Sequence, residues 1–123
     1  MPIRELLALA PVIPVITIEK LEHAVPLARA LCAGGLRVLE VTLRTPAGLP
    51  AIEAMRKSVP EAVVGVGTLA RPEDFAMADS AGAQFGVSPG LTADLAAAAA
   101  SAASWNMALS RLPSEVKCIS LPA

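Results

Sequence analysis

The chain has 123 residues, of which 54% are hydrophobic and 17% are charged, and its formal net charge is -1. That composition is too apolar for a disordered chain, and the length suits one domain with one core. With aromatic residues at 2% and no basic run, the sequence argues against nucleic acid or an anionic membrane as a partner. No stretch approaches the roughly 20 apolar residues of a membrane span, and residues 1–9 lack the pattern of a signal peptide. We therefore expect a cytoplasmic protein.

Strand-like and helix-like segments alternate along most of the chain. Runs rich in β-branched or apolar residues predict strands at 11–18, 37–43, 62–67 and 84–88. Helical spacing and capping residues predict helices at 19–32, from Thr45-Pro46 or Pro50 to Ser58, from Pro72 to Gly82, and from Thr92 through the alanine run. A proline inside a helical pattern favours a kink, so we expect one at Pro26.

Alternating β and α units are typical of a parallel sheet, and the fold class predicted here is α/β. About four βα units make a partial (β/α)8 TIM-type barrel, too short to close, with residues 1–103 as its N-terminal half. Residues 104–123 show no clear strand followed by a helix and are expected to form a divergent tail. An open half-barrel would expose its sheet edges and an inner face carrying Val15, Val38 and Val66, so we expect association.

The segment 37–43 carries the most chemical information. Successive side chains of a strand point to opposite faces, so Leu39 and Val41 should face the helices. Glu40, Thr42 and Arg44 should then point into the barrel, near its C-terminal mouth, where active sites of such barrels lie. A partly desolvated Glu40 could move protons, and Arg44 could hold a carboxylate or phosphate. The alternative is an Arg–Glu pair on an exposed edge strand.

Other polar residues have both a functional and a structural interpretation. Thr68 follows the third strand and could belong to the mouth or simply cap a helix. Ser88 has no partner histidine for a nucleophilic triad. His23, the single histidine, is expected at the surface, and Cys32 is expected to be a buried structural thiol. One histidine and no cysteine cluster leave no good set of transition-metal ligands, so no metal is expected.

Several blocks of the sequence match one family. The segments are PVIPVIT at 11–17, KLEHAVPLARAL at 20–31, AGGLRVLEVTLRT at 33–45, VGVGTL at 64–69 and GAQFGVSPGLT at 82–92. Together they closely resemble 2-dehydro-3-deoxy-phosphogluconate aldolase, the KDPG/KHG aldolase family. The LEVTLRT and SPG blocks separate this family from other phosphate-sugar barrels such as epimerases or synthases.

The resemblance implies a homotrimeric (β/α)8 barrel that cleaves 2-dehydro-3-deoxy-6-phosphogluconate into pyruvate and glyceraldehyde 3-phosphate. It implies a class I mechanism with a lysine Schiff base and no metal or other cofactor. The proton-shuttling glutamate of the family falls on Glu40, the pyruvate carboxylate ligands fall on Arg44 and Thr68, and the site-lining proline falls on Pro89. The expected partner is therefore a small keto-acid phosphate.

The Schiff-base lysine is where this sequence departs from the family. KCISLPA at 117–123 echoes the family motif K-F-F-P-A with a wrong spacing, and PSEV at 113–116 supports a conflicting alignment. The strand expected before PSEV is missing from the sequence, which suggests an altered or deleted tail. Lys20 and Lys57 fall at helix ends. Two interpretations stay open: a class I aldolase, inactive in this form, or a non-catalytic fragment of one.

Overall fold

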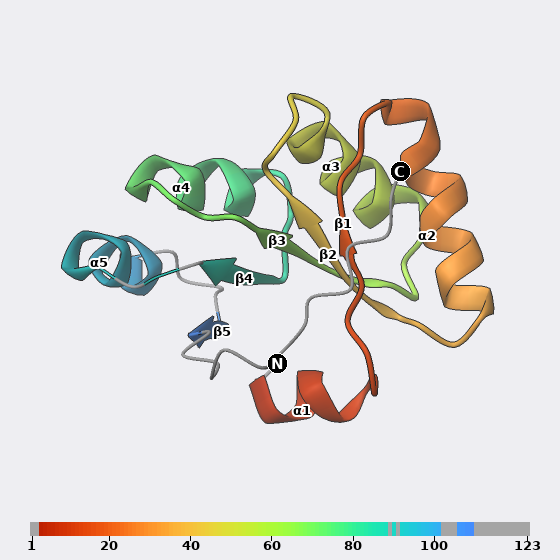
Figure 1. The fold of residues 1–123 in the computed structure, drawn as a ribbon, viewed down its shortest axis with the longest axis horizontal. Helices are drawn as coiled ribbons and strands as arrows, with labels where there is room; N and C mark the ends of the chain where they lie inside the picture. Colours follow the sequence, from red (N-terminus) through yellow and green to blue (C-terminus); the bar gives the residue numbers. More distant parts are fainter. Residues whose placement is uncertain (1–2, 89, 91, 102–105, 110–123) are drawn as a thin grey trace.

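A computed structural model describes residues 3–88, 90, 92–101 and 106–109 of the chain. Its centre is one parallel sheet in which the strands lie in chain order (Figure 1). The strands are β1 (Val15–Ile16), β2 (Val38–Thr42), β3 (Val63–Gly67), β4 (Phe85–Ser88) and β5 (Asn106–Leu109). The predicted α/β class and parallel strands are confirmed, and the sheet is an incomplete barrel.

Helices connect the strands in the order that the sequence predicts. They are α1 (Ile3–Ala8), the 3-10 turn η1 (Leu21–His23), α2 (Ala24–Ala33), α3 (Gly48–Ser58), α4 (Pro72–Ser80) and α5 (Ala93–Ser101). Thr92 caps α5 as predicted, since the Leu95 amide donates to its hydroxyl at 3.2 Å. The short helix α1 was not expected, and it lies at the end of the sheet where β1 begins (Figure 1).

Prolines account for three differences from the predicted elements. The run 11–18 pairs only over Val15–Ile16, because prolines have no amide to donate to a ladder. The kink expected at Pro26 has no cause, since Pro26 is the third residue of α2, where a missing amide removes no helical bond. Neither Thr45-Pro46 nor Pro50 begins α3: Ala47 is its N-cap, and Pro50 lies in its first turn.

Glycine at position 48 explains where α3 begins. A Cβ there would lie 2.6 Å from the carbonyl oxygen of Thr42, closer than any real Cβ contact. The first residue of α3 therefore packs directly on the end of β2, and this close approach needs glycine.

The fifth strand lies within residues 104–123, where the sequence shows no clear strand followed by a helix. Residues Asn106–Leu109 pair in parallel with β4, starting at Phe85↔Asn106. A four-residue segment without β-branched side chains gives a weak local signal, and the neighbouring strand supplies the hydrogen bonds that order it. The strand thought to be missing is thus present. The remaining residues of the expected tail, 104–105 and 110–123, lie outside the described residues.

The sheet has two differently covered faces. On the outer face, Leu39, Val41, Val64 and Val66 form one core with the helices, including Ala28, Ile52 and Met55. On the inner face, Val38 and Phe85 pack with Leu6 of α1 and with Ala10. Val38 thus lies where predicted, whereas Val66 was assigned to the wrong face. Because Val38 and Phe85 are the first residues of their strands, α1 covers the amino end of the inner face.

Candidate active site

Glu40 lies in the middle of β2, on the inner face of the sheet. Its neighbours Leu39 and Val41 belong to the outer core, and Val38 belongs to the inner cluster. Strand alternation therefore turns Glu40 away from the helices, as the sequence predicts. It pairs in register with Val15 on one side and with Gly65 on the other.

Two glycines of β3 create the space above the inner face. A Cβ on Gly67 would lie 2.9 Å from Cδ and 3.0 Å from Cγ of Glu40, so the glutamate side chain extends over Gly67. A Cβ on Gly65 would overlap the ring of Phe85. Glycine in a strand interior often marks such a close approach. The sequence alone does not name Glu40 and Phe85 as the groups that approach these glycines.

The environment of Glu40 favours its protonated form. Burial raises the pKa of this carboxyl, because a charged carboxylate loses hydration there, and the nearby positive charge of Arg44 opposes part of that rise. A carboxyl with a raised pKa exchanges protons closer to neutral pH than an ordinary glutamate does. Glu40 therefore has the properties of a general acid or base.

Arg44 and Thr68 follow the carboxyl ends of neighbouring strands and lie in one place. The Leu43 amide donates to the Gly67 carbonyl at 3.0 Å, which ties the segments after β2 and β3 together. Both Arg44 and Thr68 line a cavity of about 510 Å³. Arg44 is exposed and Thr68 is half-buried. The structure thus brings these two residues together, and the charge of Arg44 acts on Glu40.

Thr68 has an unusual backbone. Its φ is 64°, in the left-handed region, and no other non-glycine residue of the described chain has a positive φ. This region is costly for a β-branched residue, and such strain gathers at functional sites. A plain helix-capping role is excluded, because α4 begins at Pro72 with Arg71 at its N-cap.

Two threonines on the same face of the sheet as Glu40 were not among the predicted site residues, although strand alternation places Thr42 on that face. Thr42 is buried, and its hydroxyl oxygen is 3.2 Å from that of Thr17. Thr42 is two residues from Glu40 on the same face. The signal for Thr17 was present in the alternation of the run 11–18, where Ile16 and Ile18 both belong to the outer core.

The turn after β4 is built around Ser88. Its hydroxyl lies 2.8 Å from the Leu69 carbonyl oxygen and 2.5 Å from that of Gly90, and the Gly90 amide approaches it at 3.4 Å. Ser88 therefore shapes the turn, in keeping with its dismissal as a nucleophile. Pro89, predicted to line the site, lies outside the described residues.

The remaining singled-out residues that the structure describes lie at or near the ends of helices. Lys20 is exposed at the start of η1, and Lys57 is exposed in the last turn of α3. His23 is exposed at the N-cap of α2. Burial raises the pKa of the half-buried Cys32 thiol, and Glu61 adds to the rise, so its thiolate is disfavoured. Lys117 is outside the described residues.

The described part of the chain holds no cluster of three or more histidine, cysteine, aspartate or glutamate side chains that could bind a metal ion. Among the described residues, no helix is both long enough and apolar enough to cross a membrane.

The model of the family "Aldolase: KDPG and KHG aldolase" matches residues 3–116. The chain belongs to this aldolase family. The resemblance carried by the LEVTLRT and SPG blocks is thereby confirmed, and the match extends past residue 103 into the segment expected to be divergent.

Relatives of known sequence agree. The KHG/KDPG aldolase of Escherichia coli K12 is 58% identical over 94 residues, which are 76% of this chain and 44% of that protein. The 2-dehydro-3-deoxy-phosphogluconate aldolase of Dickeya dadantii is 55% identical over 95 residues, 77% of this chain and 45% of that protein. The chain thus spans less than half the length of these relatives.

Solved structures show the same fold. The Zymomonas mobilis ZM4 2-keto-3-deoxy-6-phosphogluconate aldolase, crystallised with 3-phosphoglycerate, superposes with a TM-score of 0.80 at 51% identity, covering 85% of this chain and 49% of that one. The Legionella pneumophila KDPG aldolase, with pyruvate captured as a covalent carbinolamine, superposes with a TM-score of 0.73 at 49% identity. The superposition covers 76% of this chain and 45% of that one.

Proposed function

We propose that this chain supplies the proton-transfer and carboxylate-binding half of a class I aldolase. The reaction is cleavage of 2-dehydro-3-deoxy-6-phosphogluconate to pyruvate and glyceraldehyde 3-phosphate. The observation that carries the proposal is Glu40, a half-buried carboxyl with a raised pKa, placed over Gly67 on the inner face. Membership of the aldolase family and the carbinolamine formed by the Legionella relative support the reaction type.

Each residue has a distinct role in this proposal. Arg44 binds the substrate carboxylate through charge-assisted hydrogen bonds, and Thr68 adds its hydroxyl from the adjoining strand end. Glu40 then transfers protons to and from the bound keto acid, a step worth about 10²–10⁴-fold in rate. Pro89 is proposed to line the same site. The proposed substrate is a keto-acid phosphate, and the homotrimer and cytoplasmic location remain predictions.

A carbinolamine is the adduct of an amine with a carbonyl, so the chemistry needs a lysine near the mouth. A nucleophilic lysine also needs desolvation or a neighbouring cation to lower its pKa. Lys20 and Lys57 are exposed, one at the start of η1 and the other in the last turn of α3. This observation favours the second candidate function, in which the chain as given binds the keto acid without cleaving it.

Borohydride reduction in the presence of pyruvate separates the two candidates. Borohydride traps an imine between pyruvate and a lysine as a stable adduct, which peptide mass spectrometry then assigns. We expect no adduct on Lys20, Lys57 or Lys117, and no release of pyruvate from the phosphorylated substrate. A stoichiometric adduct on Lys117, absent from the Lys117→Arg variant, would show that this chain is an active aldolase.

Binding is tested separately from catalysis. Pyruvate titrated into the isotopically labelled chain should shift the amide resonances of Leu43 and Leu69, which adjoin Arg44 and Thr68. Arg44→Met should abolish the shift, while Arg29→Met, an exposed arginine on α2, should not change it. Unchanged binding in Arg44→Met would remove the carboxylate-binding role.

A further inference from the structure

A groove on the helix side of the sheet opens beside the mouth. It lies between the start of α3 and the start of α4, and its volume of about 510 Å³ is in the range of small-molecule sites. Its walls carry cationic, hydroxyl and apolar side chains, among them Arg44, Arg71, Thr68, Leu43, Leu49 and Met77. Leu43 and Leu49 pack against the outer core, so this wall of the groove lies on the helix side of the sheet.

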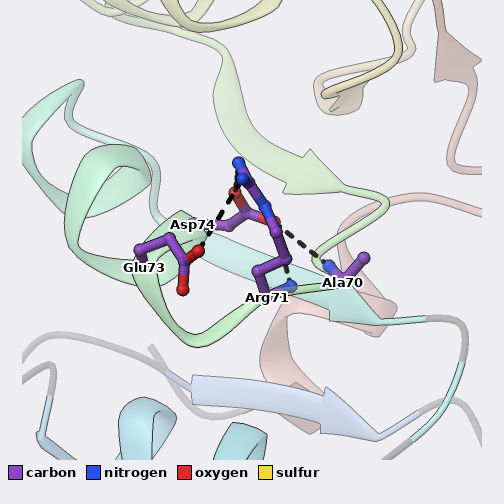
Figure 2. Close-up of polar contacts among 4 residues, drawn as sticks. All are labelled: Ala70, Arg71, Glu73 and Asp74. Atoms are coloured by element: carbon purple, nitrogen blue, oxygen red, sulfur yellow. Dashed lines mark hydrogen bonds and ion pairs between the residues drawn. The ribbon is translucent and has the colours of Figure 1, made fainter.

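Arg71 is held in place by the acidic first turn of α4 (Figure 2). The buried Asp74 carboxylate accepts hydrogen bonds from the backbone amides of Ala70 at 3.2 Å and Arg71 at 3.0 Å. It also accepts a hydrogen bond from the Arg71 guanidinium at 3.0 Å. Glu73 lies 3.7 Å from another nitrogen of the same guanidinium. A guanidinium has five N–H donors, so Arg71 keeps free donors after these contacts.

The balance of charge in the groove favours an anion. Of its charged residues, Asp74 has both oxygens occupied by the contacts above, so it offers little to a cation. Arg44 makes no ion pair within 4.0 Å with any residue that the structure describes. Two arginines therefore present unused donors to one cavity, and Leu49 and Met77 offer apolar contact for a short carbon chain.

We propose that this groove binds a small organic acid with two anionic groups, one held by Arg71 and the other by Arg44. Arg71 has no part in the proposed aldolase chemistry, so the groove adjoins the site that contains Glu40 and shares Arg44 and Thr68 with it. Because Arg44 adjoins both, an occupant of the groove competes for Arg44 with a carboxylate bound at the mouth.

The test uses phosphoglycolate, which carries a phosphate and a carboxylate, and inorganic phosphate as the matched single-group probe. Each is titrated into the isotopically labelled chain while the amides of Ala70 and Arg71 are followed. We expect saturable shifts, with phosphoglycolate binding more tightly than phosphate. Because a hydrogen-bonded charge pair is lost, Arg71→Met should weaken phosphoglycolate binding about tenfold or more, and Arg29→Met should leave it unchanged.

A second variant tests the same groove independently, in case Arg71→Met fails to fold. Met77 is 42% exposed, so Met77→Glu places a negative charge in the groove without disturbing the core. It should abolish phosphoglycolate binding and leave the pyruvate-dependent shift of Leu69 intact, which separates this proposal from the aldolase one. Equal phosphoglycolate affinity in wild type and both variants, or shifts that do not saturate, would overturn the proposal.

Discussion

Replacing Gly65 with alanine tests how the inner face is packed. The new Cβ overlaps the ring of Phe85, which is 2% exposed and packed against Val38 and Leu6. The ring has no free space to move into, so the overlap must be relieved by strain. Overpacking of this kind costs about 1–3 kcal/mol.

A smaller opposing effect comes from the unfolded chain. Alanine restricts that chain more than glycine does, which by itself stabilises the folded state by about 0.4–1 kcal/mol. The net expectation is therefore that Gly65→Ala lowers the free energy of unfolding by about 1–2 kcal/mol. Gly67→Ala is the matched control, since its Cβ meets the flexible and partly exposed side chain of Glu40. It should change stability by less than about 1 kcal/mol and displace the carboxyl instead.

Urea denaturation measures both variants, with the change read from the transition midpoint at constant m. A double-mutant cycle then assigns the cause: in a Phe85→Leu background, Gly65→Ala should cost at least about 1 kcal/mol less than in wild type. The inference that Phe85 packs on Gly65 is wrong if Gly65→Ala is as stable as wild type. It is also wrong if the substitution lowers the free energy of unfolding equally in both backgrounds.

Four further outcomes are expected. Glu40→Gln should stabilise the chain at neutral pH, because the pKa of Glu40 is raised in the folded state. The folded state then binds more protons than the unfolded state, so the stability of the wild type falls as the pH rises above 4.5. In melts at several pH values, the stability advantage of the glutamine variant should vanish below that pH. Thr68→Gly should be about 1 kcal/mol more stable than Thr68→Ala, since only glycine relieves the positive φ, and equal midpoints would argue against strain. Asp74→Ala should cost about 1–2 kcal/mol and Asp74→Asn much less, because the amide oxygen still accepts the amides at the start of α4; equal costs in thermal melts would contradict this. The edge strands β1 and β5 each pair on one side only within the described sheet, so light scattering should show concentration-dependent association, and a monodisperse monomer would oppose it.

Much of this architecture follows from local pattern alone. The alternation in 37–43 placed Leu39 and Val41 against helices and Glu40 on the opposite face, because a strand has a two-residue period that no tertiary contact can change. The βα order likewise predicted parallel pairing. Specific blocks such as LEVTLRT indicated the aldolase family, which the family model confirms over residues 3–116.

Other features were decided by contacts between distant segments. β5 is ordered by the free edge of β4, and its own sequence gives little sign of it. The face that Val66 takes depends on the register of β3 against β2. Val66 pairs with Val41, so both side chains lie in the outer core. The cavity beside Thr68 arises where the starts of α3 and α4 flank the ends of two strands, so Arg71 and Arg44 come to line one cavity only after folding. Sequence periodicity determines which face a side chain takes, whereas tertiary packing determines which other side chain it meets there.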